Sequence, residues 1–234
     1  MIYLGIDDTD TLETAGTNQL AREIVRRLAD RLRCVSVVRH QLFFDPRVPY
    51  TSKNGSASIR FERVGQLPIE DVAATVRHIM QEWFVEGSNP GLVLAERIPE
   101  EVTAYGQRCK SEFIEQSEPR DLAAKHGIHL EGLGGTEGGV IGALAAVGLI
   151  ATENDGRVVQ WQTWPDDLTG PTPVEILYQR RVAVRRLDQG TKVTQGVVDL
   201  GKRLRPNLVE RECVLWVNPA HEPAGCDWIA LKML

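Results

Sequence analysis

Residues 1–24, MIYLGIDDTDTLETAGTNQLAREI, contain the pattern on which the predicted fold depends. Residues 2–6 are an apolar run, which predicts a short β-strand. Three like charges follow this strand within four positions: Asp7, Asp8 and Asp10. From residue 17 to about residue 33, apolar residues recur at helical spacing, which predicts an amphipathic helix. The chain is therefore expected to begin as a strand, an acidic loop and a helix.

The segments that follow extend this beginning into a larger unit. Alternating or β-branched runs predict three more strands, and a second amphipathic pattern predicts one more helix. The strands are expected at residues 35–44, 56–62 and 92–95, and the helix at residues 69–83. The resulting order, β-α-β-β-α-β, is that of a ferredoxin-like unit, an antiparallel sheet with two helices on one face.

The second half of the chain is less regular, and a seam is expected near residues 98–101. We predict a ferredoxin-like α+β domain at 1–98 and a second α/β domain at 99–234, with a functional site shared between them. The expected elements are helices at 100–117, 121–126 and 140–151, and strands at 157–162, 174–187, 213–218 and 228–233.

The composition is that of an ordinary soluble globular protein. The 234 residues are 42% hydrophobic and 25% charged, and the formal net charge of −5 argues against a nucleic-acid binder in bulk electrostatic terms. The four cysteines are too few and too dispersed for a zinc knuckle or a disulfide scaffold: Cys34, Cys109, Cys213 and Cys226. Reduced thiols and a cytoplasmic location are expected.

No membrane association is expected either. The N-terminus lacks the basic segment and apolar core of a signal peptide. The longest apolar run, residues 140–151, is shorter than the roughly 20 residues that span a bilayer.

The acidic cluster has two interpretations. Carboxylates at the end of a strand suit Mg²⁺, which takes oxygen ligands and keeps waters beside a substrate phosphate. A cation would also neutralise charges that otherwise raise each other's cost of ionising. The alternative is an acidic turn that caps the next helix. The candidate metal ligands are Asp7, Asp8 and Asp10.

Two further polar positions are candidates for phosphate contact. Thr17 opens the first predicted helix, where free N–H groups attract anions, although the residue alone favours an ordinary N-cap. Lys53, beside the Asn54-Gly55 dipeptide, could reach a phosphate as a point charge, although Asn-Gly is also a common turn. Asn89, Pro90 and Gly91 form a second such turn.

A glycine-rich segment precedes the apolar helix at residues 140–151. Glycines let backbone N–H groups approach a ligand, and a helix start favours anions. The segment is not a Walker A loop, because no GK[ST] follows. The alternative is a flexible turn with close helix packing, to which we assign Gly142. The candidate nucleotide-binding residues are Gly134, Gly135, Thr136, Glu137, Gly138, Gly139 and Asn54.

Four arginines gather in one late segment: Arg180, Arg181, Arg185 and Arg186. Such pairs usually form a solvated face, and they could also hold phosphate.

Several motifs, in the same order along the chain, resemble those of the archaeal tRNA(Ile2) 2-agmatinylcytidine synthetases. The motifs are GIDDTDT (5–11), GTNQLA (16–21), VPYTSKNGSASI (48–59), SNPGLVL (88–94), GGTEGGVIGALAAVG (134–148) and RPNLVERECVLWV (205–217). The glycine-rich motif is the most specific of them.

The resemblance implies an activity and a division of roles. That family joins agmatine to a wobble cytidine at the expense of ATP, and its catalytic half combines an unusual kinase-like domain with a ferredoxin-like domain. By position, the three aspartates match its metal-associated motif, Thr17 matches a phosphoryl-linked threonine, and residues 134–139 match its nucleotide-associated loop.

The departures from the family limit the inference. The second threonine of the family's pair is Asn18 here, and Gly16 replaces a cysteine often found before that pair. The family's OB-fold and zinc ribbon, which grip tRNA, have no counterpart in these 234 residues. This chain is therefore expected to share the family's use of ATP more closely than its tRNA substrate.

These observations predict a Mg²⁺- and ATP-dependent enzyme of kinase or ligase type. Its acceptor would be a small molecule or an RNA delivered by a partner, without tight tRNA binding by the chain alone. The alternatives are a nucleotide sensor or assembly subunit without turnover, and a tRNA-modifying enzyme with RNA binding supplied in trans. A homodimer is among the states that the sequence allows. The predicted catalytic residues are Asp7, Asp8, Thr17 and Lys53.

Overall fold

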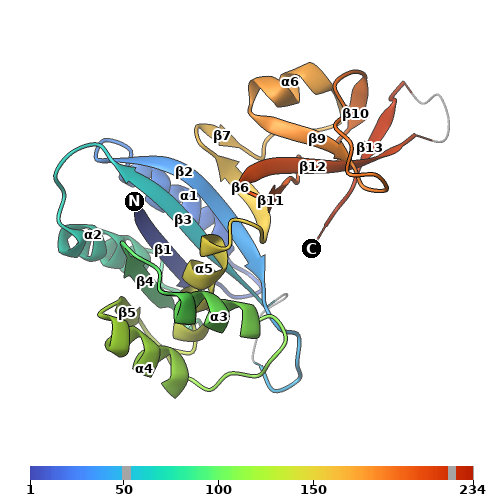
Figure 1. Ribbon diagram of the computed structural model, residues 1–234. Coiled ribbons are helices and arrows are strands. Elements are labelled where there is room, and N and C mark those ends of the chain that lie inside the picture. The colour runs from blue at the N-terminus through green and yellow to red at the C-terminus, as the bar shows by residue number, and fades with distance from the viewer. Residues whose placement is uncertain (49–53, 221–224, 234) are drawn as a thin grey trace. The chain divides into compact units, whose positions relative to one another are not determined.

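The computed structural model describes residues 1–48, 54–220 and 225–233. The chain divides into two compact units, Met1–Thr152 and Glu153–Leu234 (Figure 1). This division differs from the predicted seam near residue 98, because the segment that follows the predicted ferredoxin-like unit packs onto the same sheet.

The first unit begins with the predicted element order, β-α-β-β-α-β. These elements are β1 (Ile2–Asp7), α1 (Thr17–Arg27), β2 (Leu32–Gln41), β3 (Gly55–Arg63), α2 (Ile69–Glu82) and β4 (Gly91–Ala95). Four elements complete the unit: α3 (Glu100–Arg108), α4 (Ser117–His126), β5 (His129–Gly132) and α5 (Val140–Ala151).

The strands of the first unit form one antiparallel sheet in the order β5-β4-β1-β3-β2. Strand β1 lies in the middle, where Leu4 is paired with Ile59 of β3 and Leu94 of β4. All five residues of β4 are buried, as expected for a strand that is covered on both faces and therefore reads as a continuous apolar run.

Both faces of this sheet carry helices (Figure 1). Gly5 of β1 lies against the backbone of Ala143 in α5, which leaves no room for a side chain. Because side chains alternate along a strand, the buried Leu4 and Ile6 lie on the opposite face, where α1 contacts β1, β2 and β3. Helices α3 and α5 thus cover the face that a two-layer arrangement would leave open, and they tie residues 99–152 to the first unit.

Several elements of the first unit differ from prediction. Helix α1 ends at Arg27 and Leu32 begins β2, so this leucine is buried in the sheet rather than on the helix. Helix α3 is shorter than predicted and α4 is longer. Strand β5 was not predicted, because its four residues, HLEG, are too few to establish a strand period and include no β-branched residue.

The second unit is built mainly of short strands. They are β6 (Arg157–Trp161), β7 (Trp164–Pro165), β8 (Pro171–Pro173), β9 (Val182–Arg186), β10 (Val197–Asp199), β11 (Asn207–Val209), β12 (Glu212–Pro219) and β13 (Trp228–Ala230), with one helix, α6 (Val174–Gln179). The order is β6-β11-β12-β13-β10-β8, with β7 paired to β6 and β9 paired in parallel to β12.

The prediction of one strand over residues 174–187 is wrong. The first part is helix α6, which begins after Pro173 and buries Val174 and Leu177, three positions apart. Arg181 then takes a left-handed backbone conformation, with φ of 59°, and separates the helix from β9. A short apolar run cannot be assigned to helix or strand by periodicity alone.

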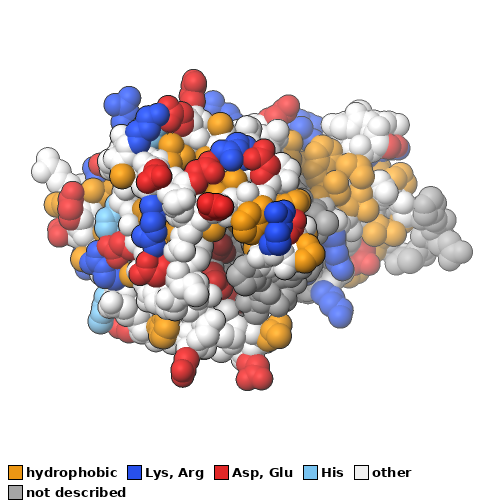
Figure 2. All heavy atoms as spheres, turned by 90° about the horizontal axis from the view of Figure 1, so that it is seen from below, with side chains coloured by type: hydrophobic (Ala, Val, Ile, Leu, Met, Phe, Trp, Pro, Cys, Tyr) orange, Lys and Arg blue, Asp and Glu red, His pale blue; other side chains and the backbone are white. Residues whose placement is uncertain are grey.

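Charge is divided unevenly between the units. The first unit holds 21 acidic and 16 basic residues and the second holds 11 of each, so the net charge of −5 belongs to the first. On the face drawn in Figure 2, Lys and Arg side chains alternate with Asp and Glu rather than forming a patch of one sign. Ion pairs of the first unit include Lys125–Glu101 and Arg108–Glu118.

All four cysteines are free thiols, as predicted. Within the described residues, no helix has the length and apolarity that a bilayer crossing requires.

Candidate functional site

The predicted acidic loop (Asp7–Asp10) and glycine loop (Gly134–Gly139) meet at the turn Ser88–Gly91. Strand pairing brings them there. Gly91, the first residue of β4, is in register with Asp7 at the end of β1 and with Gly132 at the end of β5. Each loop therefore leaves its strand beside the turn, although the two loops lie far apart in sequence.

Asn89 is bonded to both loops. Its backbone N–H donates to the Asp8 carbonyl (3.1 Å), and its own carbonyl accepts from the Gly139 N–H (2.9 Å). Its side-chain Nδ2 donates to Asp8 Oδ2 (2.8 Å), while Oδ1 accepts from the N–H and the hydroxyl of Thr136 (2.8 and 2.9 Å). One asparagine thus uses every polar group it has to hold the two loops together.

Asp7 points toward the first turn of α5. A Cβ at Gly142 would overlap the Asp7 carboxylate, so glycine at this helix position makes room for the acid. Burial raises the pKa of Asp7 to about 7, and the charge of Asp8 adds to the shift. Gly142, assigned to helix packing in the sequence, therefore accommodates a predicted site residue.

Asp8 has a left-handed backbone conformation, with φ of 51°. Such conformations are uncommon outside glycine and are most accessible to Asn and Asp. Burial raises the pKa of the Asp8 carboxyl, and the hydrogen bond from Asn89 opposes this. The conformation turns the chain so that the side chain of Asp8 meets Asn89.

Asp10 and Thr17 form a separate contact. The Thr17 hydroxyl donates to Asp10 Oδ1 (3.1 Å) and accepts from the Thr9 hydroxyl (3.1 Å). Burial raises the pKa of Asp10, and hydrogen bonds from the side chain and backbone of Thr17 lower it. The N-cap of α1 is Gly16, so the ordinary N-cap interpretation does not apply to Thr17.

The three aspartates are neighbours, but each faces a different group. Across the described ranges 1–48, 54–220 and 225–233, no three His, Cys, Asp or Glu side chains are arranged as a ready-made metal site. Mg²⁺ rarely needs such a cage, because one or two carboxylates commonly hold it together with waters and substrate phosphates. The acidic loop fits the second kind of site.

The glycine loop is anchored by its own polar residues. Arg120 of α4 is paired with Glu137 (2.5 Å), and Gln116 donates to the Thr136 carbonyl (3.0 Å). Three of the loop's N–H groups donate within the protein, namely those of Thr136, Glu137 and Gly139. A backbone cradle for phosphate therefore has to use the remaining N–H groups of the loop.

Neighbouring glycines of the loop have different surroundings. A Cβ at Gly139 would lie 2.5 Å from the Asn89 carbonyl oxygen, 2.6 Å from the Gly91 nitrogen and 2.8 Å from the Asp7 carbonyl oxygen. At Gly138 it would lie 3.4 Å from the Thr136 hydroxyl, an ordinary contact, and the backbone there is not left-handed. Gly138 therefore does not need glycine for its backbone conformation or for packing within the protein, whereas Gly139 does for packing.

The remaining predicted residues lie on the connection between β2 and β3. Lys53 falls outside the described residues. Asn54 donates from Nδ2 to the Phe43 carbonyl (2.7 Å), and its own carbonyl accepts from the Leu42 N–H (2.9 Å). These bonds are what a turn residue makes, and none of them joins Asn54 to the acidic loop or the glycine loop.

Sequence reasoning missed two residues of this site. Asn89 was read only as part of a turn. Arg39, near the end of β2, lies close enough for its charge to lower the pKa values of both Asp7 and Asp10, against the stronger effect of burial. The one sequence signal for Arg39 was a cation within the apolar run at residues 35–44, in a strand that ends near the acidic loop.

No protein-family model matches the chain. The chain is similar to the tRNA(Ile2) 2-agmatinylcytidine synthetase TiaS of Archaeoglobus fulgidus, with 29% identity over 152 residues, which are 63% of this chain and 35% of that protein. It is also similar to TiaS of Cenarchaeum symbiosum, with 24% identity over 183 residues, 72% of this chain and 40% of that protein. The chain thus spans well under half the length of these curated relatives.

The chain is also similar to solved structures of this kind of enzyme. A structure described as a tRNA fluorescent labeling enzyme matches with a TM-score of 0.55 and 25% identity, over 63% of this chain and 35% of that chain. The TiaS–tRNA(Ile2)–ATP complex matches with a TM-score of 0.54 and 25% identity, over 63% of this chain and 36% of that chain. These likenesses agree with the resemblance that the sequence motifs indicated.

Proposed function

We propose that this chain is an ATP- and Mg²⁺-dependent enzyme of kinase or ligase type, related in its chemistry to the agmatinylcytidine synthetases. It would activate an acceptor oxygen by phosphoryl transfer. The acceptor is a small molecule or an RNA that a partner delivers. The observation that carries the proposal is the bonding of Asn89 to Asp8 on one side and to Thr136 and Gly139 on the other.

The arrangement suits a metal-bound triphosphate. Phosphoryl transfer depends mainly on positioning and on stabilising charge, so a site needs a carboxylate for the metal close to donors for the phosphates. Asp7 and Asp8 supply the carboxylates. Burial raises the pKa values of both, and a bound cation would offset the cost of keeping them ionised. The remaining N–H groups of the glycine loop would donate to the phosphates, and the start of α5 adds a favourable helix dipole. Mg²⁺, when bound, supplies charge neutralisation between the carboxylates and the phosphates.

Two charged groups complete the proposed site. Arg39 already acts on Asp7 and Asp10, and it is placed to offset negative charge near them. The second is Lys53, which is proposed as a phosphate contact on sequence grounds alone. The uncharged Thr17, whose hydroxyl donates to Asp10, lies at the start of α1 and is proposed as a further phosphate contact.

The similarity to the agmatinylcytidine synthetases also supports a fold assignment. We propose that the β-α-β-β-α-β segment is ferredoxin-like, that it is combined with a kinase-like arrangement in the catalytic half, and that the protein works in the cytoplasm, with a homodimer as one state to test.

The test is Mg²⁺-dependent ATP binding by calorimetry, comparing the unaltered chain with Asp8→Asn. Asparagine tolerates the left-handed backbone at position 8 and keeps an oxygen acceptor for Asn89, so the thermal midpoint should stay near that of the unaltered chain. ATP affinity in Mg²⁺ should fall at least about tenfold, which corresponds to about 1.4 kcal/mol. A fall of several degrees in the midpoint with unchanged affinity would identify the acidic loop as purely structural.

A second variant in the same assay separates the two loops. Gly138→Val should fold, since a Cβ at this position makes only an ordinary contact, and it should lose ATP binding if the loop approaches the phosphates. A folded variant with normal ATP affinity would remove the glycine loop from the proposal. Slow ATP hydrolysis that disappears in Asp8→Ala would distinguish the enzyme from the rival interpretation, a nucleotide sensor.

The chain alone should not bind tRNA tightly. Three of the four arginines that suggested a basic patch have acidic partners: Arg180 with Asp167, Arg185 with Glu212 and Arg186 with Asp188. Non-specific RNA affinity comes largely from cations that neutralise phosphates, and these are already neutralised. A gel-shift titration near physiological salt should show no sub-micromolar complex. A tight complex that is lost when the four arginines become alanine would contradict this.

A further inference from the structure

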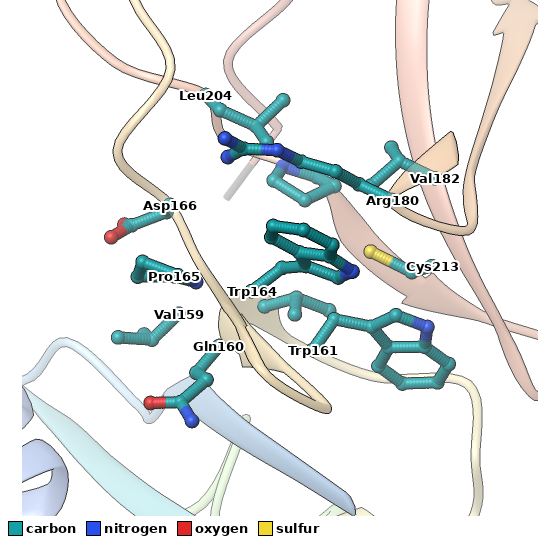
Figure 3. A pocket seen from close by; sticks show the side chains of 12 residues that line it. Val159, Gln160, Trp161, Trp164, Pro165, Asp166, Arg180, Val182, Leu204 and Cys213 are labelled. Carbon is teal, nitrogen blue, oxygen red and sulfur yellow. The ribbon is translucent and has the colours of Figure 1, made fainter. Parts of the chain in front are cut away.

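The second unit contains an aromatic pocket that has no part in the proposed ATP site. Trp161 and Trp164 stand opposite each other across the two-residue hairpin between β6 and β7, so their side chains share one face. Figure 3 shows both indoles in the pocket, with Arg180 lying over Trp164. Leu204, Pro206 and Cys213 add to the walls.

Arg180 and Trp164 form a stacked pair. The guanidinium carbon lies 4.9 Å from the centre of the Trp164 ring, and the same guanidinium donates to Asp167. The side chain of Arg180 is 17% exposed, while Trp164 is 39% exposed. The ion pair therefore fixes the guanidinium as a flat surface beside an indole that remains accessible.

The two acidic residues at the pocket, Asp166 and Asp167, are each paired with an arginine. Asp166, which is 4% exposed, accepts from Arg157 (2.8 Å), and Arg203 lies 3.9 Å from the same carboxylate oxygen. With Asp166 and Asp167 both paired to arginines, the pocket presents little negative charge to an incoming anionic ligand.

Three more cations lie beside lining residues in sequence. Arg181 follows Arg180, and Lys202 and Arg205 lie in the segment that supplies Leu204 and Pro206. Arg181 and Lys202 are exposed and Arg205 is partly exposed. In the described part of the second unit, none of the three takes part in an ion pair. Free cations thus flank the aromatic pocket on two chain segments.

We propose that this pocket binds one unpaired base of an RNA strand, with the neighbouring phosphates held by Arg181, Lys202 and Arg205. Bases stack on aromatic rings and on arginine planes, and positively charged side chains follow the backbone on either side. The empty space of about 230 Å³ includes open solvent, so this hollow does not enclose a ligand. A base that belongs to a longer strand can lie against its exposed aromatic surface without being enclosed.

An RNA base suits the site better than a peptide does. An apolar peptide side chain would use the tryptophans but would leave three cations without a counter-charge. A base with phosphates on both sides satisfies the stacking surfaces and the cations together. The expected affinity is weak, because one base and three cations contribute, and it agrees with the absence of tight tRNA binding predicted above.

The test measures binding of a fluorescent ten-nucleotide single-stranded RNA to the full chain by anisotropy, at low salt and without ATP or Mg²⁺. These conditions make the result independent of the proposed nucleotide site. Trp164→Ala should weaken binding about tenfold, within the range for loss of one stacked base, and Trp164→Phe should restore most of it. Trp164 is partly exposed, so the thermal midpoints of both variants should stay near that of the unaltered chain.

Matched charge variants complete the test. Arg181→Gln should weaken binding and reduce its salt dependence, whereas Lys192→Gln, at an exposed lysine not next to a lining residue, should do neither. An unchanged affinity in Trp164→Ala would overturn the proposal. Equal affinity for duplex RNA, or full competition by a mononucleotide at a similar concentration, would also overturn it, since neither result needs an unpaired base within a strand.

Discussion

Replacing Gly139 with alanine should lower the free energy of unfolding by about 3 kcal/mol, the upper part of the usual range for overpacking a core. The new Cβ would lie 2.5–2.8 Å from backbone atoms of Asn89, Gly91 and Asp7. Backbone atoms of three segments cannot move aside as a flexible side chain can. Chemical denaturation, followed by circular dichroism, measures the change.

Gly138→Ala is the matched control for this prediction. It adds the same methyl group one residue earlier, in the same loop, where the nearest atom is 3.4 Å away. The free energy of unfolding should change by less than about 0.5 kcal/mol, as for most surface positions. Equal losses at the two positions would mean that the acidic loop, the turn and the glycine loop do not pack as described.

Asn89→Ala should destabilise the protein by about 2–3 kcal/mol and weaken ATP binding at least about tenfold. The variant loses three side-chain hydrogen bonds, each of which contributes roughly 1 kcal/mol. It also removes the side chain that links Asp8 of the acidic loop to Thr136 of the glycine loop. Denaturation and calorimetry of the same preparation give both numbers.

Ser88→Ala is the control in the same turn. The Ser88 hydroxyl donates to the Val85 carbonyl, which belongs to neither loop. This variant should lose about 1 kcal/mol of stability and keep its ATP affinity. If Asn89→Ala behaved in the same way, the asparagine would be a structural turn residue and the proposed site would lose its central link.

Patterns that repeat within one element were predictable from the sequence. The helix expected at residues 69–83 is found at Ile69–Glu82, and the apolar run at residues 140–151 is helix α5. Both have enough residues for a period to be counted. Strand β5 and helix α6 have four and six residues, and their neighbours, not their own periodicity, decide their conformation.

The candidate site was predictable only in part, for a related reason. Asp7, Asp8 and the glycine loop stand out as unusual local clusters. Asn89 does not, because SNPG is an ordinary turn sequence and its role depends on the pairing of β4 with β1 and β5. Local reading also could not distinguish Gly138 from Gly139, since the difference lies in which backbone segments approach each one.

The position of α5 on the sheet constrains the order in which the chain acquires its structure. Within the first unit, strand β1 is synthesised before the other elements, and the helix that packs against its Gly5 is synthesised last. During translation, the first four strands can pair while one face of the sheet stays uncovered, and that face is closed only after residue 151 has emerged. Contacts this distant in sequence slow folding, because a long loop must be ordered before they form. The acidic loop and the glycine loop belong to these two ends, so the site is completed in the final step, and a nascent chain stopped at residue 98 would expose an apolar sheet face to chaperones.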